Sequence, residues 1–172
     1  MMPEVQYQAT LVANHTHHIQ KMTINVADVL DGLELFQDFS YAELKIIGRY
    51  LLRVKKAQGD TVFTEGDPGD YMLILAEGKL SIFKGGEHGT HLLCHEGRGR
   101  IVGEMALLDH ERRSATCVAD ADCVMLTLDE AGLRRMAAEA PLLAYRFMFG
   151  LARLLSRRLR RTSGMLVEFL TS

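Results

Sequence analysis

The stretch GDTVFTEGDPGDYMLILAEGKLSIF, Gly59–Phe83, contains three short runs of β-type residues separated by turns. The runs TVFT, YMLILAE and KLSIF are rich in β-branched, aromatic and aliphatic side chains, and the segments EGDPGD and EG lie between them. Short strands at nearly even spacing with glycine turns are typical of an all-β barrel or sandwich. The proline of this stretch, Pro68, falls in a turn. The stretch therefore predicts a β domain.

The same character extends on both sides of this stretch, from Arg53 to Leu128. The run RVKKA precedes it, and the runs HLLCH, RIVG, SATCVA and CVMLTL follow it. Two of the intervening segments, KGGEHG and EGRGR, again carry the glycines that mark turns. We expect the whole region to form one barrel or sandwich.

Helical signals lie on the N-terminal side of the β region. The segment VADVLDGLELFQDFS, residues 26–40, predicts short helical pieces. Ser40 and Glu43 form a capping-box signature, and apolar residues follow them at helical spacing. This pattern predicts a helix from about Tyr41 to Leu52.

A second helical region begins after Leu128. Asp129 is a candidate N-cap for a helix that ends before Pro141, and Pro141 suits the first turn of a long C-terminal helix. One apolar stripe of the long helix contains Phe147, Leu151 and Leu154. A second stripe alternates steps of four and three residues, as a heptad seam does, and consists of Met148, Ala152, Leu155, Leu159, Thr162, Leu166 and Phe169.

The two stripes leave two interpretations of the long helix open. It can lie on the barrel as a single amphipathic helix, or it can pair with the same helix of a second copy. Because a helix that only covers a barrel rarely needs two stripes, we favour a homodimer with parallel C-terminal helices. The remaining face is interpreted as solvated rather than as a polyanion site, and it carries Arg153, Arg157, Arg160 and Arg161.

The composition is that of an ordinary globular protein, with 172 residues, 48% hydrophobic and 24% charged. The net charge of −2 does not indicate a nucleic-acid or anionic-membrane partner. No apolar run approaches the roughly 20 residues that span a bilayer, and the N-terminus lacks the features of a signal peptide. The three cysteines show no C-x-x-C spacing, so we expect a cytoplasmic protein without disulfides.

We expect three segments in the chain. Residues 1–22 form a flexible N-terminal segment, because they are polar and rich in histidine. Residues 23–140 form the β domain with its flanking helices. Residues 141–172 form the long helix, which is the expected dimerisation element.

The stretch GEMALLDHERRSAT, Gly103–Thr116, carries the candidate ligand site. Gly103 precedes a short helix whose first N–H groups are free to bind an anion, and it lets a ligand approach the backbone. Arg113 supplies a planar fork that matches phosphate oxygens, and Ser114 adds a hydroxyl. Glu104 would repel a phosphate, so it must face a neutral donor such as a ribose hydroxyl. The alternative is a salt bridge between Glu104 and Arg113 that only closes the loop, and the chemistry alone leaves both readings open.

The segments Gly59–Phe83 and GRIVGEMALLDHERRSAT together resemble the cyclic-nucleotide-binding domain family, which includes catabolite activator proteins and regulatory subunits of cAMP-dependent kinase. The resemblance covers roughly residues 33–159. It implies a mainly β fold, a β-roll or jelly-roll-like double-stranded β-helix with N-terminal helices and a long C-terminal helix. The glycines that occupy the family's turn positions are Gly59, Gly66, Gly69, Gly78 and Gly103.

The resemblance also implies a role for each residue of the ligand site. Glu104 holds the ribose 2′-hydroxyl, and Arg113 and Ser114 hold the cyclic phosphate. The backbone amides of Gly103, Met105 and Ala106 complete the pocket, while Arg112 is one residue out of register and is expected to be solvated. The implied ligand is cAMP, with cGMP as the second choice, and no cofactor or metal is implied.

Two departures from the family pattern qualify this expectation. Family members that act as transcription factors carry a helix-turn-helix domain after the long helix, and this sequence stops at Ser172, so we expect no direct DNA binding. Catabolite activators contact adenine through hydroxyl side chains on the long helix. Counting from Pro141 places Arg158 and Leu159 at those positions, which predicts weak discrimination between cAMP and cGMP.

Other candidate sites carry less weight. In EHGTHLLCHEG, strand alternation would put His91 and His95 on one face and Cys94 on the other, so a metal site that also includes His88 is disfavoured. The histidines at positions 15, 17 and 18 lie in the expected flexible segment. Cys117 and Cys123 fall in predicted strands and are expected to be core thiols. No nucleophile–base pair stands out, so we do not expect an enzyme.

The sequence as a whole predicts a cytoplasmic cyclic-nucleotide sensor that signals through its C-terminal helix to a partner, which can be a separate effector protein. The main alternative is a scaffold or partner-binding module of the same fold that no longer binds nucleotide. A metal-dependent barrel enzyme is a third and weaker alternative.

Overall fold

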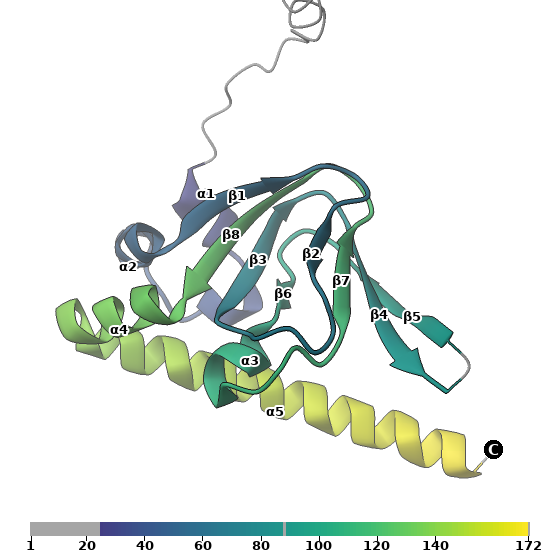
Figure 1. The fold of residues 1–172 in the computed structure, drawn as a ribbon. Coiled ribbons are helices and arrows are strands. Elements are labelled where there is room, and N and C mark those ends of the chain that lie inside the picture. Colours follow the sequence, from purple (N-terminus) through teal and green to yellow (C-terminus); the bar gives the residue numbers. More distant parts are fainter. Residues whose placement is uncertain (1–24, 88, 172) are drawn as a thin grey trace, which may run out of the picture.

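The computed structural model describes residues 25–87 and 89–171, and these form an antiparallel β-roll of two four-stranded sheets with helices packed on one side (Figure 1). The predicted fold class is confirmed. The expected flexible segment 1–22, with its three histidines, and His88 lie outside the described residues.

The two sheets contain alternate segments of the chain. One sheet has the strand order β1-β8-β3-β6 and the other has the order β2-β7-β4-β5. All eight predicted runs form strands, although β4 and β5 extend further than their runs and β6 is shorter. The strands are β1 Leu52–Lys56, β2 Thr61–Phe63, β3 Tyr71–Glu77, β4 Leu80–Gly86, β5 Gly89–Glu96, β6 Ile101–Val102, β7 Thr116–Ala119 and β8 Cys123–Asp129.

Strand β3 separates two hydrophobic clusters because alternate side chains of a strand point to opposite faces. Met72 and Ile74 belong to the cluster between the roll and the helices, whereas Leu73 and Leu75 belong to the cluster inside the roll. All four side chains are 0% exposed. Burial on both faces explains the nearly continuous apolar run YMLILAE.

The pairing of β4 with β5 contains a β-bulge. Cys94 pairs with Ile82 and Leu92 pairs with Phe83, so Leu93 has no partner in the ladder. An extra residue reverses the alternation of side chains beyond it. His91 therefore shares a face with Cys94, and the expectation that His91 and His95 share one is wrong. His95 instead approaches Ser81 on β4, with 3.0 Å between Nδ1 and Oγ.

The helices begin where the capping residues predict. The Ser40 capping box is present, and the Asp129 side chain accepts a hydrogen bond of 2.7 Å from the backbone N–H of Gly132. The helix from Tyr41 is shorter than expected, since it changes to a 3₁₀ turn at Gly48. The helical elements are α1 Val26–Leu30, η1 Glu34–Phe36, α2 Tyr41–Ile47, η2 Gly48–Tyr50, α3 Glu104–Asp109, α4 Glu130–Glu139 and α5 Pro141–Thr171.

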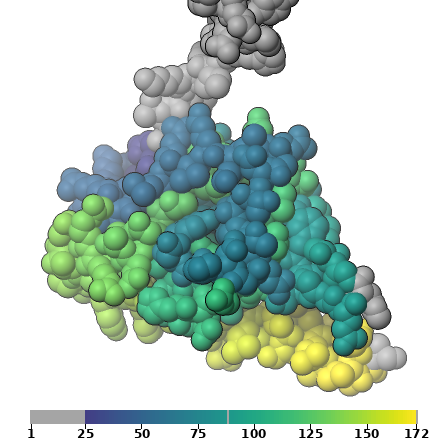
Figure 2. Space-filling view, in the orientation of Figure 1, coloured from purple at the N-terminus to yellow at the C-terminus, as the bar shows by residue number. Residues whose placement is uncertain are grey.

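The long helix α5 has two different halves. Its first half packs on η1 and α4, and the predicted stripe of Phe147, Leu151 and Leu154 is buried there. Gly150 allows this contact, because a Cβ at this position would lie 2.8 Å from Leu35 Cδ1. From Leu159 to Thr171 every residue is exposed. Figures 1 and 2 show this second half, in yellow, at the same end of the molecule as the β4–β5 hairpin.

Within residues 25–87 and 89–171, no helix combines the length and the hydrophobicity that a membrane crossing requires.

Candidate functional site

The predicted site is built where β6 ends and α3 begins. Gly103 has φ 79°, in the left-handed region that favours glycine. A Cβ at Gly103 would lie 2.5 Å from Arg113 Nη1, so a side chain there would displace the guanidinium. Gly69 serves a similar purpose, because its Cβ would lie 2.1 Å from the Cβ of Ala106. The two glycines let α3 and Arg113 approach the turn before β3.

Arg113 is a buried cation, and two of its guanidinium nitrogens have no hydrogen-bond partner. Its residue is 3% exposed, and its guanidinium lies over the rings of both Phe63 and Tyr71, at 4.3 and 4.4 Å from their centroids. Nη1 donates to the carbonyl of Gly103 at 3.0 Å, while Nε and Nη2 have no hydrogen-bond partner. An unpaired buried charge of this kind is costly unless an anion completes its hydrogen bonds. The geometry therefore fits an anionic ligand.

Glu104 is also 3% exposed, but its partner is not Arg113. Arg158 of α5 donates from Nη1 to Glu104 Oε1 at 2.6 Å and from Nη2 to the Ile101 carbonyl at 2.8 Å. No Glu104–Arg113 ion pair occurs among the residues that the structure describes. The alternative, a Glu104–Arg113 salt bridge that only closes the loop, is therefore wrong, because Glu104 pairs with Arg158.

A cavity of about 170 Å³ opens between α3, the segment after it, and the β4–β5 hairpin. All six predicted site residues line it. Ser114 is fixed on the hairpin side, because its carbonyl accepts a hydrogen bond of 2.6 Å from Lys84 Nζ. The walls of the cavity include Phe63, Ile82, Cys94, Glu96, Gly103, Glu104, Met105, Ala106, Arg113, Ser114 and Arg158.

The positions outside the predicted set behave differently from one another. Arg112 is exposed, as expected, and its Nη1 donates to the Gly66 carbonyl at 2.7 Å. Leu159 is 68% exposed and does not line the cavity, whereas Arg158 does. Sequence reasoning missed Cys94 and Glu96 as wall residues. Their spacing of two residues on one strand indicates that both side chains lie on the same face. The bulge at Leu93 prevents the sequence from showing that this face lines the cavity.

The three cysteines are free thiols, and they differ in how deeply they are buried. Cys117 and Cys123 are buried, as expected, and desolvation raises the pKa of Cys117 to about 12. Cys94 is exposed, and burial of its sulfur together with the neighbouring Glu96 carboxylate raises its pKa. In the described part of the chain, no three His, Cys, Asp or Glu side chains are grouped to hold a metal ion.

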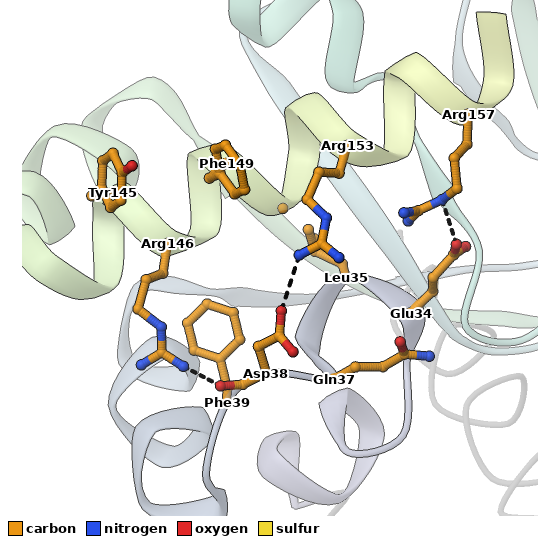
Figure 3. A pocket seen from close by; sticks show the side chains of 11 residues that line it. Glu34, Leu35, Gln37, Asp38, Phe39, Tyr145, Arg146, Phe149, Arg153 and Arg157 are labelled. Carbon is orange, nitrogen blue, oxygen red and sulfur yellow. Dashed lines mark hydrogen bonds and ion pairs between the residues drawn. The ribbon is translucent and has the colours of Figure 1, made fainter. Parts of the chain in front are cut away.

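A second hollow lies between η1 and α5 (Figure 3). It has a volume of about 90 Å³ and three arginines on its wall. Arg153 pairs with Asp38 at 3.1 Å and Arg157 with Glu34 at 2.7 Å, while Arg146 binds Glu43 and the Asp38 carbonyl. Each guanidinium has a protein partner here, so this hollow offers no buried, unsatisfied donor comparable to those of Arg113.

Comparison with known proteins identifies the family of the chain. The family model described as "Cyclic nucleotide-binding domain" matches residues 53–140. The chain is 35% identical over 134 residues to "Cyclic AMP receptor protein" of Thermus thermophilus, covering 76% of this chain and 59% of that protein. It is 34% identical over 107 residues to "cAMP-dependent protein kinase regulatory subunit" of Aspergillus niger, covering 62% and 26%.

The solved structures agree in fold. A crystal structure of a cyclic nucleotide-binding domain from Methylobacillus flagellatus superposes with a TM-score of 0.74 and 29% identity, over 83% of this chain and 80% of that one. The chain spans about three fifths of the length of the Thermus relative and about a quarter of the Aspergillus relative. The cavity, its unsatisfied arginine and these matches lead to one conclusion: the chain belongs to the cyclic nucleotide-binding domain family.

Proposed function

We propose that this protein is a cyclic-nucleotide sensor that prefers cAMP to cGMP and transmits binding through α5. The observation that carries the proposal is the buried Arg113 guanidinium, whose Nε and Nη2 lack partners and which lines a cavity of about 170 Å³. The preference for cAMP is supported by the names of the Thermus and Aspergillus relatives. Binding, rather than catalysis, is the whole of the proposed activity.

The cavity supplies a partner for each charged or polar part of the ligand. The cyclic phosphate binds Arg113, Ser114 and the backbone amides of Gly103, Met105 and Ala106. The ribose 2′-hydroxyl donates to Glu104, which has a second carboxylate oxygen besides the one that Arg158 contacts. Charge-assisted hydrogen bonds of this kind are stronger than neutral ones, so the two ends of the sugar phosphate fix its orientation.

Arg158 links the ribose site to α5. Because its guanidinium contacts both Glu104 and the Ile101 carbonyl, a change at Glu104 is transmitted to the helix that carries Arg158. The ligand can shift the position of α5 only by its differential affinity for the two positions.

The proposed output is a homodimer formed by residues 141–172, while residues 23–140 bind the nucleotide. The support for the dimer is the heptad seam, whose members Leu159, Leu166 and Phe169 are 68%, 56% and 80% exposed. A separate effector protein would then respond to the arrangement of the two helices. The three free thiols suit the reducing cytoplasm.

Calorimetric titration with cAMP and with cGMP tests the proposal directly. We expect saturable binding of both, with cAMP favoured by about tenfold, since one hydrogen bond to a buried group separates the two bases. If millimolar nucleotide produces no binding heat and no thermal stabilisation, the sensor function is overturned in favour of a scaffold that keeps the fold.

Amide hydrogen exchange tests the transmission step separately. We expect cAMP to change the exchange of residues 159–171 in the wild type. In Arg158→Ala the ligand still binds Arg113, but the change in residues 159–171 is lost. An unaltered response in this variant would mean that α5 senses the ligand without Arg158.

A further inference from the structure

The wall of the cavity formed by β5 carries a carboxylate that the sugar phosphate does not use. Cys94 and Glu96 are two residues apart on β5 and both line the cavity. Their partners on β4, Ile82 and Leu80, are 9% and 0% exposed, so this face of the hairpin points into the roll. A carboxylate on such a face needs polar partners for both of its oxygens.

Glu96 lies at the far end of this wall from the phosphate site. Lys84 of β4 contacts the Ser114 carbonyl, and Leu80, four residues earlier, is paired with Glu96. Four residues of a strand span roughly 13 Å. For a ligand with its phosphate at Arg113 and Ser114 and its ribose at Glu104, the β5 wall that carries Glu96 is left for the base.

The carboxylate of Glu96 presents one oxygen rather than two. Its Oε2 accepts a hydrogen bond of 2.6 Å from Arg100 Nε, which fixes the side chain, and the side chain is 17% exposed. The nearest protein group to Oε1 among the described hydrogen bonds is the Cys94 thiol, at 3.7 Å. A thiol is a weak donor, so Oε1 remains available to a stronger one.

We propose that Glu96 selects 6-aminopurines over 6-oxopurines by accepting a hydrogen bond from the exocyclic amino group of the base. This inference rests on the proposed function, because it concerns the base of a nucleotide bound in the same cavity. Adenine offers an amino group at position 6. Hypoxanthine and guanine carry a carbonyl oxygen there, which the Glu96 carboxylate would repel. A single acceptor oxygen matches a single amino group.

The experiment is calorimetric titration of the wild type and Glu96→Gln with cAMP, cIMP and cGMP. A glutamine amide can donate to a 6-oxo group, and it has no charge to repel it. We expect the wild type to prefer cAMP to cIMP by about tenfold, and this ratio to fall by about tenfold in Glu96→Gln. Glu77→Gln, the same change at an exposed position on β3, should keep the wild-type ratio.

The outcomes separate this inference from the proposed function. If the wild type binds none of the three nucleotides, the proposed function itself fails. If it binds them and Glu96→Gln keeps the wild-type ratio of cAMP to cIMP, only the role of Glu96 is overturned. A preference for cGMP that Glu96→Gln removes would overturn it as well, because the carboxylate would then read the N1 and N2 donors of guanine.

A second variant guards against misfolding of the first. Glu96→Asp keeps the charge but withdraws the carboxylate by one methylene, so the preference for cAMP over cIMP should again fall. If neither variant changes the ratio while both melt as cooperatively as the wild type, Glu96 does not contact the base.

Discussion

Two hollows lie against α5, and consecutive arginines of this helix line them, one in each hollow. Arg157 pairs with Glu34 in the hollow beside η1 (Figure 3), where the ion pairs are half exposed. Arg158 pairs with Glu104 in the cavity of the β-roll, where the carboxylate side chain is 5% exposed. The first hollow satisfies its guanidinium groups with protein partners, whereas the second leaves Arg113 incomplete. Unsatisfied burial, rather than the number of charges, distinguishes a ligand site from a surface network.

The sharpest test of this comparison removes the incomplete arginine. Arg113→Ala should cost about 2–4 kcal/mol of cAMP binding, or roughly thirty- to a thousandfold in Kd, because the phosphate loses its buried charged partner. Calorimetry measures the loss, and Arg112→Ala is the matched control, since Arg112 is exposed. Equal effects of the two changes would show that the cavity does not hold the phosphate.

The half of α5 beyond both hollows gives the next largest effect. Replacing Leu155 and Leu159 with Glu puts like charges into the proposed seam and should convert a homodimer to monomers at micromolar concentration. Light scattering measures the mass. Replacing Arg160 and Arg161 with Glu, on the exposed face outside the seam, should leave the dimer intact. A monomeric wild type would refute the seam.

Within the cavity, substitutions of Glu104 and Arg113 should differ in their effect on affinity. Glu104→Ala removes a ribose contact and also relieves repulsion with the phosphate, so we expect a loss of about tenfold in affinity, or about 1.4 kcal/mol. Calorimetry measures the Kd for cAMP of this variant and of Arg113→Ala under the same conditions. A loss larger than that of Arg113→Ala would reverse the assigned order of the two contacts.

The hollow beside η1 should give the smallest effect. Arg153→Ala removes a surface ion pair whose two side chains are 53% and 73% exposed, and such pairs contribute about 0–1 kcal/mol. We expect a small fall in melting temperature and no change in the Kd for cAMP. If binding weakened as much as in Glu104→Ala, the two hollows would be energetically coupled through α5.

Local signals in the sequence predicted most of the fold. The Ser40 capping box, the Asp129 cap and the run YMLILAE each depend on neighbours within a few residues, and the structure confirms all three. The helix that begins at Tyr41 is shorter than predicted. Gly48 lies where it ends, and a Cβ there would be 3.1 Å from Val26 Cγ1. That contact comes from α1 and is not visible in a local pattern.

The structure brings the predicted residues to one cavity, but the sequence did not predict how they pair. Spacing alone brings Glu104 and Arg113 to one cavity, yet the partner of Glu104 is Arg158, 54 positions away on α5. The register of α5 against the roll depends on contacts such as Gly150 with Leu35, which no count from Pro141 can supply. Glu96 was not predicted to line the cavity, because the bulge at Leu93 reverses the alternation of side chains on β5. No clear sequence signal marks this bulge.

The contact of the Arg113 guanidinium with the Tyr71 ring gives the molecule an optical property. The chain has five tyrosines and no tryptophan, so its ultraviolet emission comes from tyrosine alone. The Tyr71 ring lies 4.4 Å from the Arg113 guanidinium, and its hydroxyl donates to the Val62 carbonyl at 3.0 Å. An anion that draws the guanidinium off the ring changes the field at that fluorophore. We therefore expect the tyrosine fluorescence of the unlabelled protein to change when the cavity is occupied.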